Sequence, residues 1–328
     1  MARKVTPAWD GTNCGFGLNT LDAASLDHIH SATLEVLARE GIKTNCKLAL
    51  EIYDAGGCNV DAKNGRVKIP ARVVEAAIDS APSSILFAAR DEENDFTMEG
   101  AAVHFCNFSK GVNVIDVHTG EYRASTIEDQ KNVALLVDAL DEYDLLDVAV
   151  EARDVPDQIA NIASYETMVT NCSKHSGQSA HGMREAEIMI EMAAVVAGGK
   201  ENLKKRPITS TVVCPTSPLE ISTETTEPII VYAKNEIPCT VLSMAMAGGT
   251  APVSLAGTLV IHNAEVLAGV VLGQLTNKGA PNLYGSSTTI MDLKTGAVTV
   301  GCPELAMLGA GVARLARYYN LPSYIAGG

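Results

Sequence analysis

Apolar positions change between two periods along the second half of the chain, and this alternation is the main guide to its fold. From residue 145 onward, short apolar runs alternate with longer segments in which apolar positions recur every three or four residues. The short runs are typical of buried strands, and the longer segments are typical of helices with one apolar face. The pattern predicts strands at Leu145–Val150, Lys174–Gly177, Ile208–Val213, Pro238–Ser243, Asn282–Gly285 and Ser323–Ala326. The second of these has weak strand propensity and is placed by its spacing from the others.

Helices fill the intervals between these strands. They are predicted at Gln158–Val169, Arg184–Ala197, Glu220–Lys234, Val253–Leu275 and Pro303–Tyr319. Pro303 suits a first helical position, and Gly198-Gly199 and Gly279 are typical helix stops. The spacing of the strand starts suits strand–helix–strand units of roughly 30 residues or more. Such alternation with short connections predicts a parallel sheet.

The first part of the chain, residues 1–143, lacks this regular alternation. Helices are predicted at Ser25–Glu40, Lys47–Ala55, Ala71–Ser80 and Ile127–Leu140, the last opened by a capping box at Thr126 and Asp129. Hairpins are predicted at the turn signals Asn64-Gly65 and Thr119-Gly120, with further strands at Ser84–Ala88 and Val103–Phe108. We therefore expect an N-terminal α+β module over 1–143 and the main domain over 144–328.

Six strand–helix units in one direction fit either an open doubly wound sheet or an unfinished barrel. No Gly-x-Gly-x-x-Gly follows the first strand, which weakens the dinucleotide-binding version of the open sheet. A (β/α)8 barrel needs eight strands, whereas the pattern offers six and ends at Gly328, at the tip of the sixth. We expect an α/β fold: a TIM (β/α)8 barrel, incomplete with about six of its eight strands, preceded by the α+β module.

Composition and charge narrow the classes of partner. The chain has 328 residues, of which 47% are hydrophobic, and a net charge of -14, so it lacks the basic surface that nucleic acid requires. Apolar runs such as Val266–Val271 are interrupted within a turn or two, so we expect no membrane span of roughly 18–20 residues. Met1–Cys14 lacks the apolar core of a signal peptide. A cytoplasmic protein is expected.

The cysteines and histidines provide no convincing metal or redox motif. The eight cysteines are scattered and include no Cys-x-x-Cys pair, so we interpret them as reduced thiols that fill the core. His175 and His181 lack a third residue at ligand-like spacing. No metal site is therefore predicted.

Several long segments carry a resemblance to a known enzyme family. They are the segments Tyr284–Asp292, Cys214–Leu219 and Tyr324–Gly328, and the stretch Leu26–Gly41 followed by the Asn64-Gly65 turn. In this order, along the whole chain, they resemble the trimethylamine:corrinoid methyltransferases of methylamine-using methanogens. In that family pyrrolysine follows the Gly-Gly pair, so the resemblance places it just after Gly328. It implies that this chain alone is inactive.

The resemblance also implies a reaction and its partners. A methyl group moves from trimethylamine to the Co(I) of a separate corrinoid protein, so the cobalamin-type corrinoid is carried by the partner and no cofactor is bound directly. A tertiary amine is a poor leaving group, and pyrrolysine's ring imine is expected to add it and supply positive charge on nitrogen. The protein orients the reactants and stabilises charge. We also expect a homo-oligomer.

Candidate catalytic residues follow from the rule that barrel active sites lie at the carboxyl ends of the strands. They are Glu151, Tyr284, Ser286, Ser287 and Thr288. Glu151 either stabilises a cationic adduct or protonates the imine nitrogen, or else it caps the helix that begins near Pro156. Tyr284 is either a cation–π partner or an ordinary strand aromatic. The Ser286–Thr289 run either binds the imine or the corrinoid edge or is a polar loop without a function.

Five further residues are expected to line the mouth of the barrel for substrate and corrinoid. They are Gln178, Thr216, Met246, Gly248 and Gly249. The glycine pair allows backbone to approach a ligand closely, and Met246 is either a soft contact for the corrinoid or part of the core.

Three other interpretations stay open. The same superfamily includes pyrrolysine-free methyltransferases of quaternary amines such as glycine betaine, and the codon after Gly328 separates these from the trimethylamine enzymes. A non-catalytic fragment that only oligomerises predicts folding without turnover. A metal-dependent barrel hydrolase or lyase needs a ligand set that the sequence does not offer.

Overall fold

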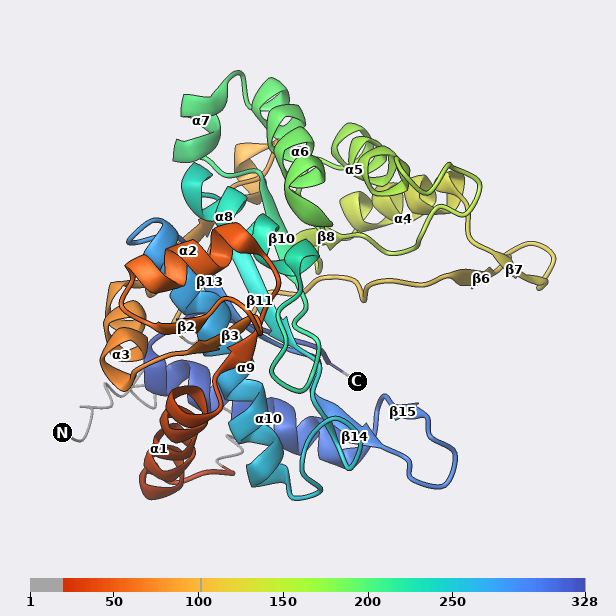
Figure 1. Cartoon of the computed structure of the whole chain (residues 1–328). Coiled ribbons are helices and arrows are strands. Elements are labelled where there is room, and N and C mark those ends of the chain that lie inside the picture. Colours follow the sequence, from red (N-terminus) through yellow and green to blue (C-terminus); the bar gives the residue numbers. More distant parts are fainter. Residues whose placement is uncertain (1–19, 101, 328) are drawn as a thin grey trace. The chain divides into compact units, whose positions relative to one another are not determined.

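The computed structural model describes residues 20–100 and 102–327, which form two compact units (Figure 1). The described residues of the first unit are 20–84, 99–100 and 213–327, and the second unit comprises Ile85–Met98 and Ala102–Val212. The sequence-based division after residue 143 stays a prediction.

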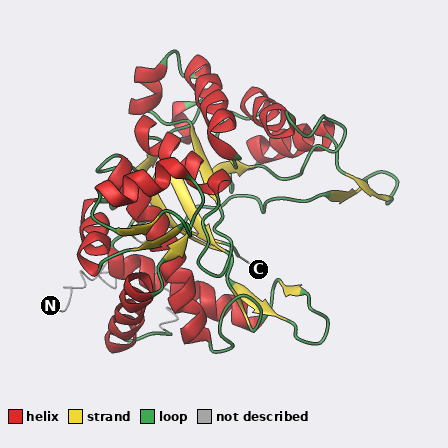
Figure 2. Ribbon diagram, in the orientation of Figure 1, coloured by secondary structure: helices red, strands yellow, loops and turns green. Residues whose placement is uncertain are grey.

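Figure 2 distinguishes the helices and strands of the whole chain by colour, and the first unit contains both kinds of element. It contains α1 (Ala23–Arg39), β1 (Ile42–Lys43), α2 (Lys47–Ala55), β2 (Asn59–Asp61), β3 (Arg66–Lys68), α3 (Ala71–Ser80), α8 (Thr223–Asn235), β11 (Cys239–Ser243), β12 (Met246–Ala247), α9 (Leu255–Thr276), β13 (Asn282–Ser286), β14 (Thr289–Met291), β15 (Val298–Thr299), α10 (Pro303–Tyr319) and β16 (Ser323–Ile325). β11, β13 and β16 are parallel neighbours in that order.

The second unit repeats the strand–helix alternation. It contains β4 (Ser84–Phe87), β5 (Phe96–Glu99) and β10 (Thr209–Val213), each but for one terminal residue, with η1 (Glu92–Asn94), β6 (Asn113–Ile115), β7 (Tyr122–Ala124), α4 (Ile127–Ala139), β8 (Leu145–Asp147), α5 (Ala160–Asn171), β9 (His175–Gln178), α6 (Gly182–Val196) and α7 (Lys200–Lys205). β8, β9 and β10 are parallel, again in chain order. The six predicted strands are therefore confirmed, three in each unit.

Helix α9 is the centre of the first unit. It packs on α1, α3, α8 and β11, and a continuous run from His262 to Gln274 is buried. Its 22 residues are long and apolar enough to cross a membrane by length and composition, although 72% of the apolar window is buried within the protein. The expectation that no apolar stretch reaches this length was wrong, because the helix continues through its polar residues.

Short elements account for most differences between the predicted and observed structure. The predicted strand Val103–Phe108 is wrong, since this extended segment makes only a single bridge, from Cys106 to Leu145. A small sheet of β12, β14 and β15 follows the ends of β11 and β13 and was not predicted. Both predicted hairpins are confirmed as the pairs β2–β3 and β6–β7.

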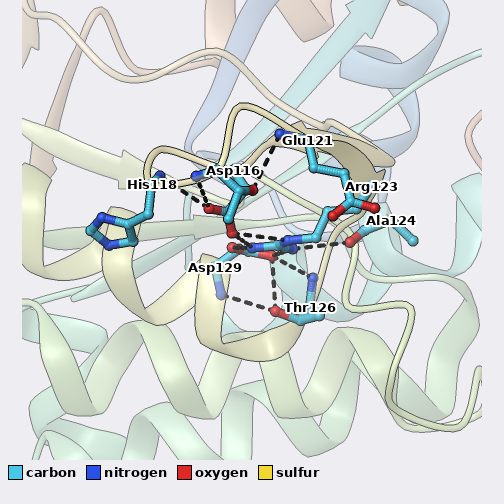
Figure 3. A network of polar contacts seen from close by, with 8 residues as sticks. Asp116, His118, Glu121, Arg123, Ala124, Thr126 and Asp129 are labelled. Carbon is cyan, nitrogen blue, oxygen red and sulfur yellow. Dashed lines mark hydrogen bonds and ion pairs between the residues drawn. The ribbon is translucent and has the colours of Figure 1, made fainter.

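An ion-pair network ties the β6–β7 hairpin to α4 (Figure 3). Arg123 on β7 lies between two carboxylates, with its Nη1 2.7 Å from Asp129 Oδ2 and its Nη2 3.1 Å from Asp116 Oδ2. Arg123 holds the pKa of Asp129 well below its usual range. Asp129 also completes the predicted capping box with Thr126, which is confirmed. The network therefore fixes both the hairpin turn and the first turn of α4.

Candidate functional site

A buried carboxylate organises the carboxyl ends of the strands in the first unit. Glu265 lies on α9 and is wholly buried. Its Oε2 accepts hydrogen bonds from Ser217 Oγ at 2.8 Å and from Ser243 Oγ at 2.6 Å, and its Oε1 accepts one from the Leu219 backbone N–H at 2.9 Å. Burial raises the pKa of Glu265, and the three hydrogen bonds oppose that shift.

The first segment that Glu265 holds is the turn of residues 216–220, which follows β10. Its ends, Thr216 and Glu220, exchange two backbone hydrogen bonds of 2.7 and 3.0 Å. Leu219 has a φ of 59°, a left-handed conformation that is costly for a residue with a side chain. The Leu219 carbonyl accepts from the Lys43 N–H at 2.8 Å. Thr216, a predicted mouth residue, is exposed on this turn.

The second segment contains three of the predicted catalytic residues, Ser286, Ser287 and Thr288. The Ser287 N–H donates to the Ser243 carbonyl at 2.9 Å, and the Thr288 N–H donates to Ser286 Oγ at 3.1 Å. Thr288 Oγ1 lies 2.9 Å from Nδ1 of His262 on α9. Ser286 and Thr288 are buried, whereas Ser287 is half-buried. Burial lowers the pKa of His262 to about 3, so the imidazole is neutral.

Tyr284 packs against α9. Its ring is wholly buried and lies edge-on to His262, and its hydroxyl donates to Asn263 Oδ1 at 2.6 Å. Burial raises its pKa well above the usual value. Asn263 Nδ2 donates in turn to the Tyr319 hydroxyl at 2.7 Å. Tyr284 is therefore a strand aromatic held by a buried polar network.

The predicted glycine pair lies in a tight turn after β12. The Gly248 N–H donates to the Ala251 carbonyl at 3.0 Å, and Thr250 Oγ1 accepts from the Met246 N–H at 3.0 Å. Gly248 has a φ of +80°, and a Cβ there would lie 3.3 Å from Leu293. A Cβ at Gly249 would lie 3.1 Å from Met291 Sδ. Both glycines thus make room for apolar side chains of the segment that begins with β14.

The second unit holds the other two candidates, Glu151 and Gln178. Gln178, at the end of β9, is wholly buried and donates from Nε2 to the Asn161 carbonyl at 2.9 Å. Glu151 is half-buried, and its backbone N–H donates to the Gly111 carbonyl at 2.8 Å. Lys110, which sequence reasoning missed, donates to Asn161 Oδ1 at 2.9 Å. Asn161 therefore connects Lys110 to the end of β9.

Two features of the site were visible in the sequence only in part. Glu265 and His262 are the only ionisable residues within the 22 residues of α9, and that isolation is the signal that could have identified them. No cluster of three or more His, Cys, Asp or Glu that could hold a metal ion occurs within residues 20–100 and 102–327. The predicted pyrrolysine position, after Gly328, lies outside the described residues.

Comparisons with known proteins place these features in a family. The model of the family described as "Trimethylamine methyltransferase (MTTB)" matches residues 6–328. A trimethylamine methyltransferase of Desulfitobacterium hafniense is 48% identical over 96% of this chain and 63% of its own length. One from Methanosarcina barkeri is 42% identical over 100% of this chain and 67% of its own. The chain thus spans about two thirds of the length of these relatives.

Two more distant similarities bear on substrate and fold. A glycine betaine methyltransferase of Desulfitobacterium hafniense is 33% identical over 94% of this chain and 64% of its own length. The crystal structure of the Methanosarcina barkeri monomethylamine methyltransferase matches with a TM-score of 0.63 at 13% identity, over 94% of this chain and 62% of its own. This likeness shows a shared fold, and the expected barrel class, with about six strands present, is confirmed.

Proposed function

Because the chain belongs to the trimethylamine methyltransferase family, we propose that it forms part of an enzyme that moves a methyl group from trimethylamine to the reduced cobalt of a corrinoid protein. The observation that carries this proposal is the family match over residues 6–328, together with relatives at 42% and 48% identity. The polar segments at the carboxyl ends of the strands support it, because barrel active sites lie there.

The proposed reaction is a displacement at carbon. The bond between nitrogen and one methyl carbon breaks, and its electron pair stays on nitrogen, which takes up a proton and leaves as dimethylamine. Co(I) of the second substrate, the corrinoid, supplies the electron pair of the new bond to the methyl group. Nitrogen must carry positive charge before it can leave, so a neighbouring carboxylate stabilises the reactive state.

The candidate residues take different roles in this proposal. The half-buried carboxylate of Glu151 stabilises the cationic nitrogen or transfers the proton. Thr216, which is exposed, and Ser287, which is half-buried, offer hydroxyl groups toward the reactants. Ser286 and Thr288 are buried, and the hydrogen bond between the Thr288 N–H and Ser286 Oγ holds the loop. Pyrrolysine, placed after Gly328 by family resemblance, supplies the electrophile that captures the amine.

Three of the four remaining mouth residues serve the second substrate in this proposal. Met246, Gly248 and Gly249 form a compact turn beside Leu293, which is 68% exposed and offers an apolar contact to the corrinoid or its carrier. Gln178 orients Asn161 rather than the reactants, since its amide donates to the Asn161 backbone. We further propose that the corrinoid stays on its partner protein and that the enzyme is a cytoplasmic homo-oligomer.

A quaternary amine such as glycine betaine is the competing substrate. The relative named for it is 33% identical, compared with 40–48% for those named for trimethylamine, which favours trimethylamine. The test supplies the full-length gene product with a reduced corrinoid protein and either amine, and follows the amine products by NMR. We expect dimethylamine from trimethylamine and no dimethylglycine from glycine betaine. Dimethylglycine from glycine betaine and no dimethylamine from trimethylamine would instead show that the protein is a quaternary-amine methyltransferase.

A further inference from the structure

The two ionisable side chains of α9 have no role in the reaction as proposed above. Glu265 and His262 lie three residues apart, so they project from the same face of the helix, one turn apart. Both are wholly buried. Burying a carboxylate is costly unless its oxygens are matched by donors, so the presence of Glu265 in this helix requires a physical reason.

The hydrogen-bond partners of Glu265 supply that reason. Its three donors, Ser217, Leu219 and Ser243, all lie on segments at or beyond the carboxyl ends of strands. Two belong to the turn of residues 216–220 and the third is the last residue of β11. Filling space beside a strand needs only an apolar side chain, whereas fixing two separate loops needs a group that accepts several hydrogen bonds.

The segment of residues 286–288, which begins with the last residue of β13, is linked to Glu265 through Ser243. Ser243, whose hydroxyl donates to Glu265, accepts through its carbonyl from the Ser287 N–H at 2.9 Å. The next residue of that segment, Thr288, is hydrogen-bonded to His262, with Thr288 Oγ1 2.9 Å from His262 Nδ1. One turn of α9 therefore fixes the loops that follow β10, β11 and β13 relative to one another.

We propose that Glu265 is a positioning residue that holds the 216–220 turn and the 286–288 segment at a fixed spacing, with His262 as its second anchor. The inference rests on the proposed function, in which the hydroxyl groups of Thr216 and Ser287 face the reactants. The fixed spacing of the two segments keeps these two hydroxyl groups in place. Glu265 does not contact the reactants. It acts through Ser217, Leu219 and Ser243.

The test removes one donor from this arrangement in the full-length gene product and uses a matched control. Ser217→Ala deletes a half-buried hydroxyl that donates to Glu265. Ser80→Ala deletes a half-buried hydroxyl that donates to Gln274, near the other end of the same helix, at 3.1 Å. Both variants lose one hydrogen bond to a polar side chain of α9, and Ser80→Ala also loses a bond to the Ala77 carbonyl, so Ser80→Ala controls for the loss of such a bond to this helix.

We expect Ser217→Ala to lower kcat for trimethylamine by about 10- to 100-fold, the order of loss that a misplacement of about 1 Å produces. Ser80→Ala should keep kcat within about twofold, because its hydrogen bond to Gln274 does not involve the loops that Glu265 holds. Both variants should melt at the same temperature. Ser217→Thr, which restores the hydroxyl, should recover most of kcat.

Hydrogen exchange gives a second readout that does not depend on turnover. The Leu219 amide, which donates to Glu265, should exchange faster in Ser217→Ala than in Ser80→Ala. Equal exchange and equal kcat in the two variants would overturn the positioning role. A wild-type enzyme that transfers no methyl group from trimethylamine would overturn the proposed function instead, and the exchange comparison would then decide by itself whether Glu265 holds the turn.

Discussion

At the scale of single residues, the protein relies on buried polar groups whose partners lie far away in the chain. Glu265 accepts from Ser217, which is 48 residues away, and Lys174 donates to three carbonyls at the end of α4. His175 is wholly buried between the Ala88 carbonyl, at 2.8 Å, and Ser210 Oγ, at 3.0 Å. Each such group stabilises one arrangement, since losing any partner leaves a buried polar atom unsatisfied.

The two buried histidines predict a dependence of stability on pH. Burial lowers the pKa of His175 to about 4 and that of His262 to about 3, from 6.5 in the unfolded chain. Below pH 6.5 the unfolded chain therefore binds protons that the folded chain does not, and stability falls as the pH drops toward 4. Each histidine contributes about 1.4 kcal/mol per pH unit at the full slope.

Urea unfolding between pH 7 and pH 5 measures this slope above the range where carboxylates titrate strongly. His175→Gln, which cannot titrate, should lose about 1 kcal/mol per pH unit of slope, averaged between pH 7 and pH 5, and keep the contribution of His262. Parallel stability curves for the variant and the wild type would show that His175 takes up a proton in the folded state.

The buried ammonium group of Lys174 is expected to contribute strongly to the free energy of unfolding. Its Nζ donates to the carbonyls of Val137 at 3.0 Å, Leu140 at 2.6 Å and Tyr143 at 2.7 Å, so it bonds one carbonyl in the last turn of α4, the C-cap carbonyl and one carbonyl of the turn that follows. Lys174→Met should lower the free energy of unfolding by about 2–3 kcal/mol. Lys131→Met, which removes a surface pair with Glu128, should change it by less than about 0.5 kcal/mol. If chemical denaturation shows the same loss of unfolding free energy in Lys174→Met and Lys131→Met, the capping role of Lys174 is contradicted.

At the scale of elements, close packing of α9 on β11 sets the position of the site. A Cβ at Gly269 would lie 2.7 and 2.8 Å from the two methyl groups of Val241. The glycine therefore brings the helix close to the strand, and Ser243, two residues further along β11, reaches Glu265, one helical turn before Gly269. The close approach and the hydrogen bond belong to the same helix–strand contact.

A pair of glycine substitutions tests this contact. Gly269→Ala should destabilise the protein by about 1–3 kcal/mol, because an added methyl group overpacks the contact with Val241. Gly309→Ala, in α10, meets only Ile325 at an ordinary 3.4 Å and should stabilise by up to about 1 kcal/mol through helix propensity. Opposite shifts in the melting temperature are expected, and a stabilising Gly269→Ala would contradict the packing argument.

At the scale of the whole molecule, the alternation of strands and helices was readable because most of the buried parallel strands contain apolar runs. β9, His175–Gln178, has no apolar side chain, and the sequence indicated it only through its spacing from its neighbours. β12 and β15 have two residues each, too few to show any period, so their sheet was missed. Val103 and Phe105 suggested a buried strand, yet they are 70% and 62% exposed. Spacing cannot reveal a partner 48 residues away, so Glu265 was taken as an interruption of an apolar run rather than as a site residue.

The most direct test of the central claim follows the cobalt of the corrinoid protein by visible absorbance after trimethylamine is added. The full-length gene product should convert the Co(I) spectrum to that of the methylated form, with one dimethylamine released per cobalt. The 328-residue chain alone should leave the spectrum unchanged. Methylation by the 328-residue chain would contradict the proposed role of pyrrolysine, and no methylation by the full-length product would contradict the assignment of trimethylamine as its substrate.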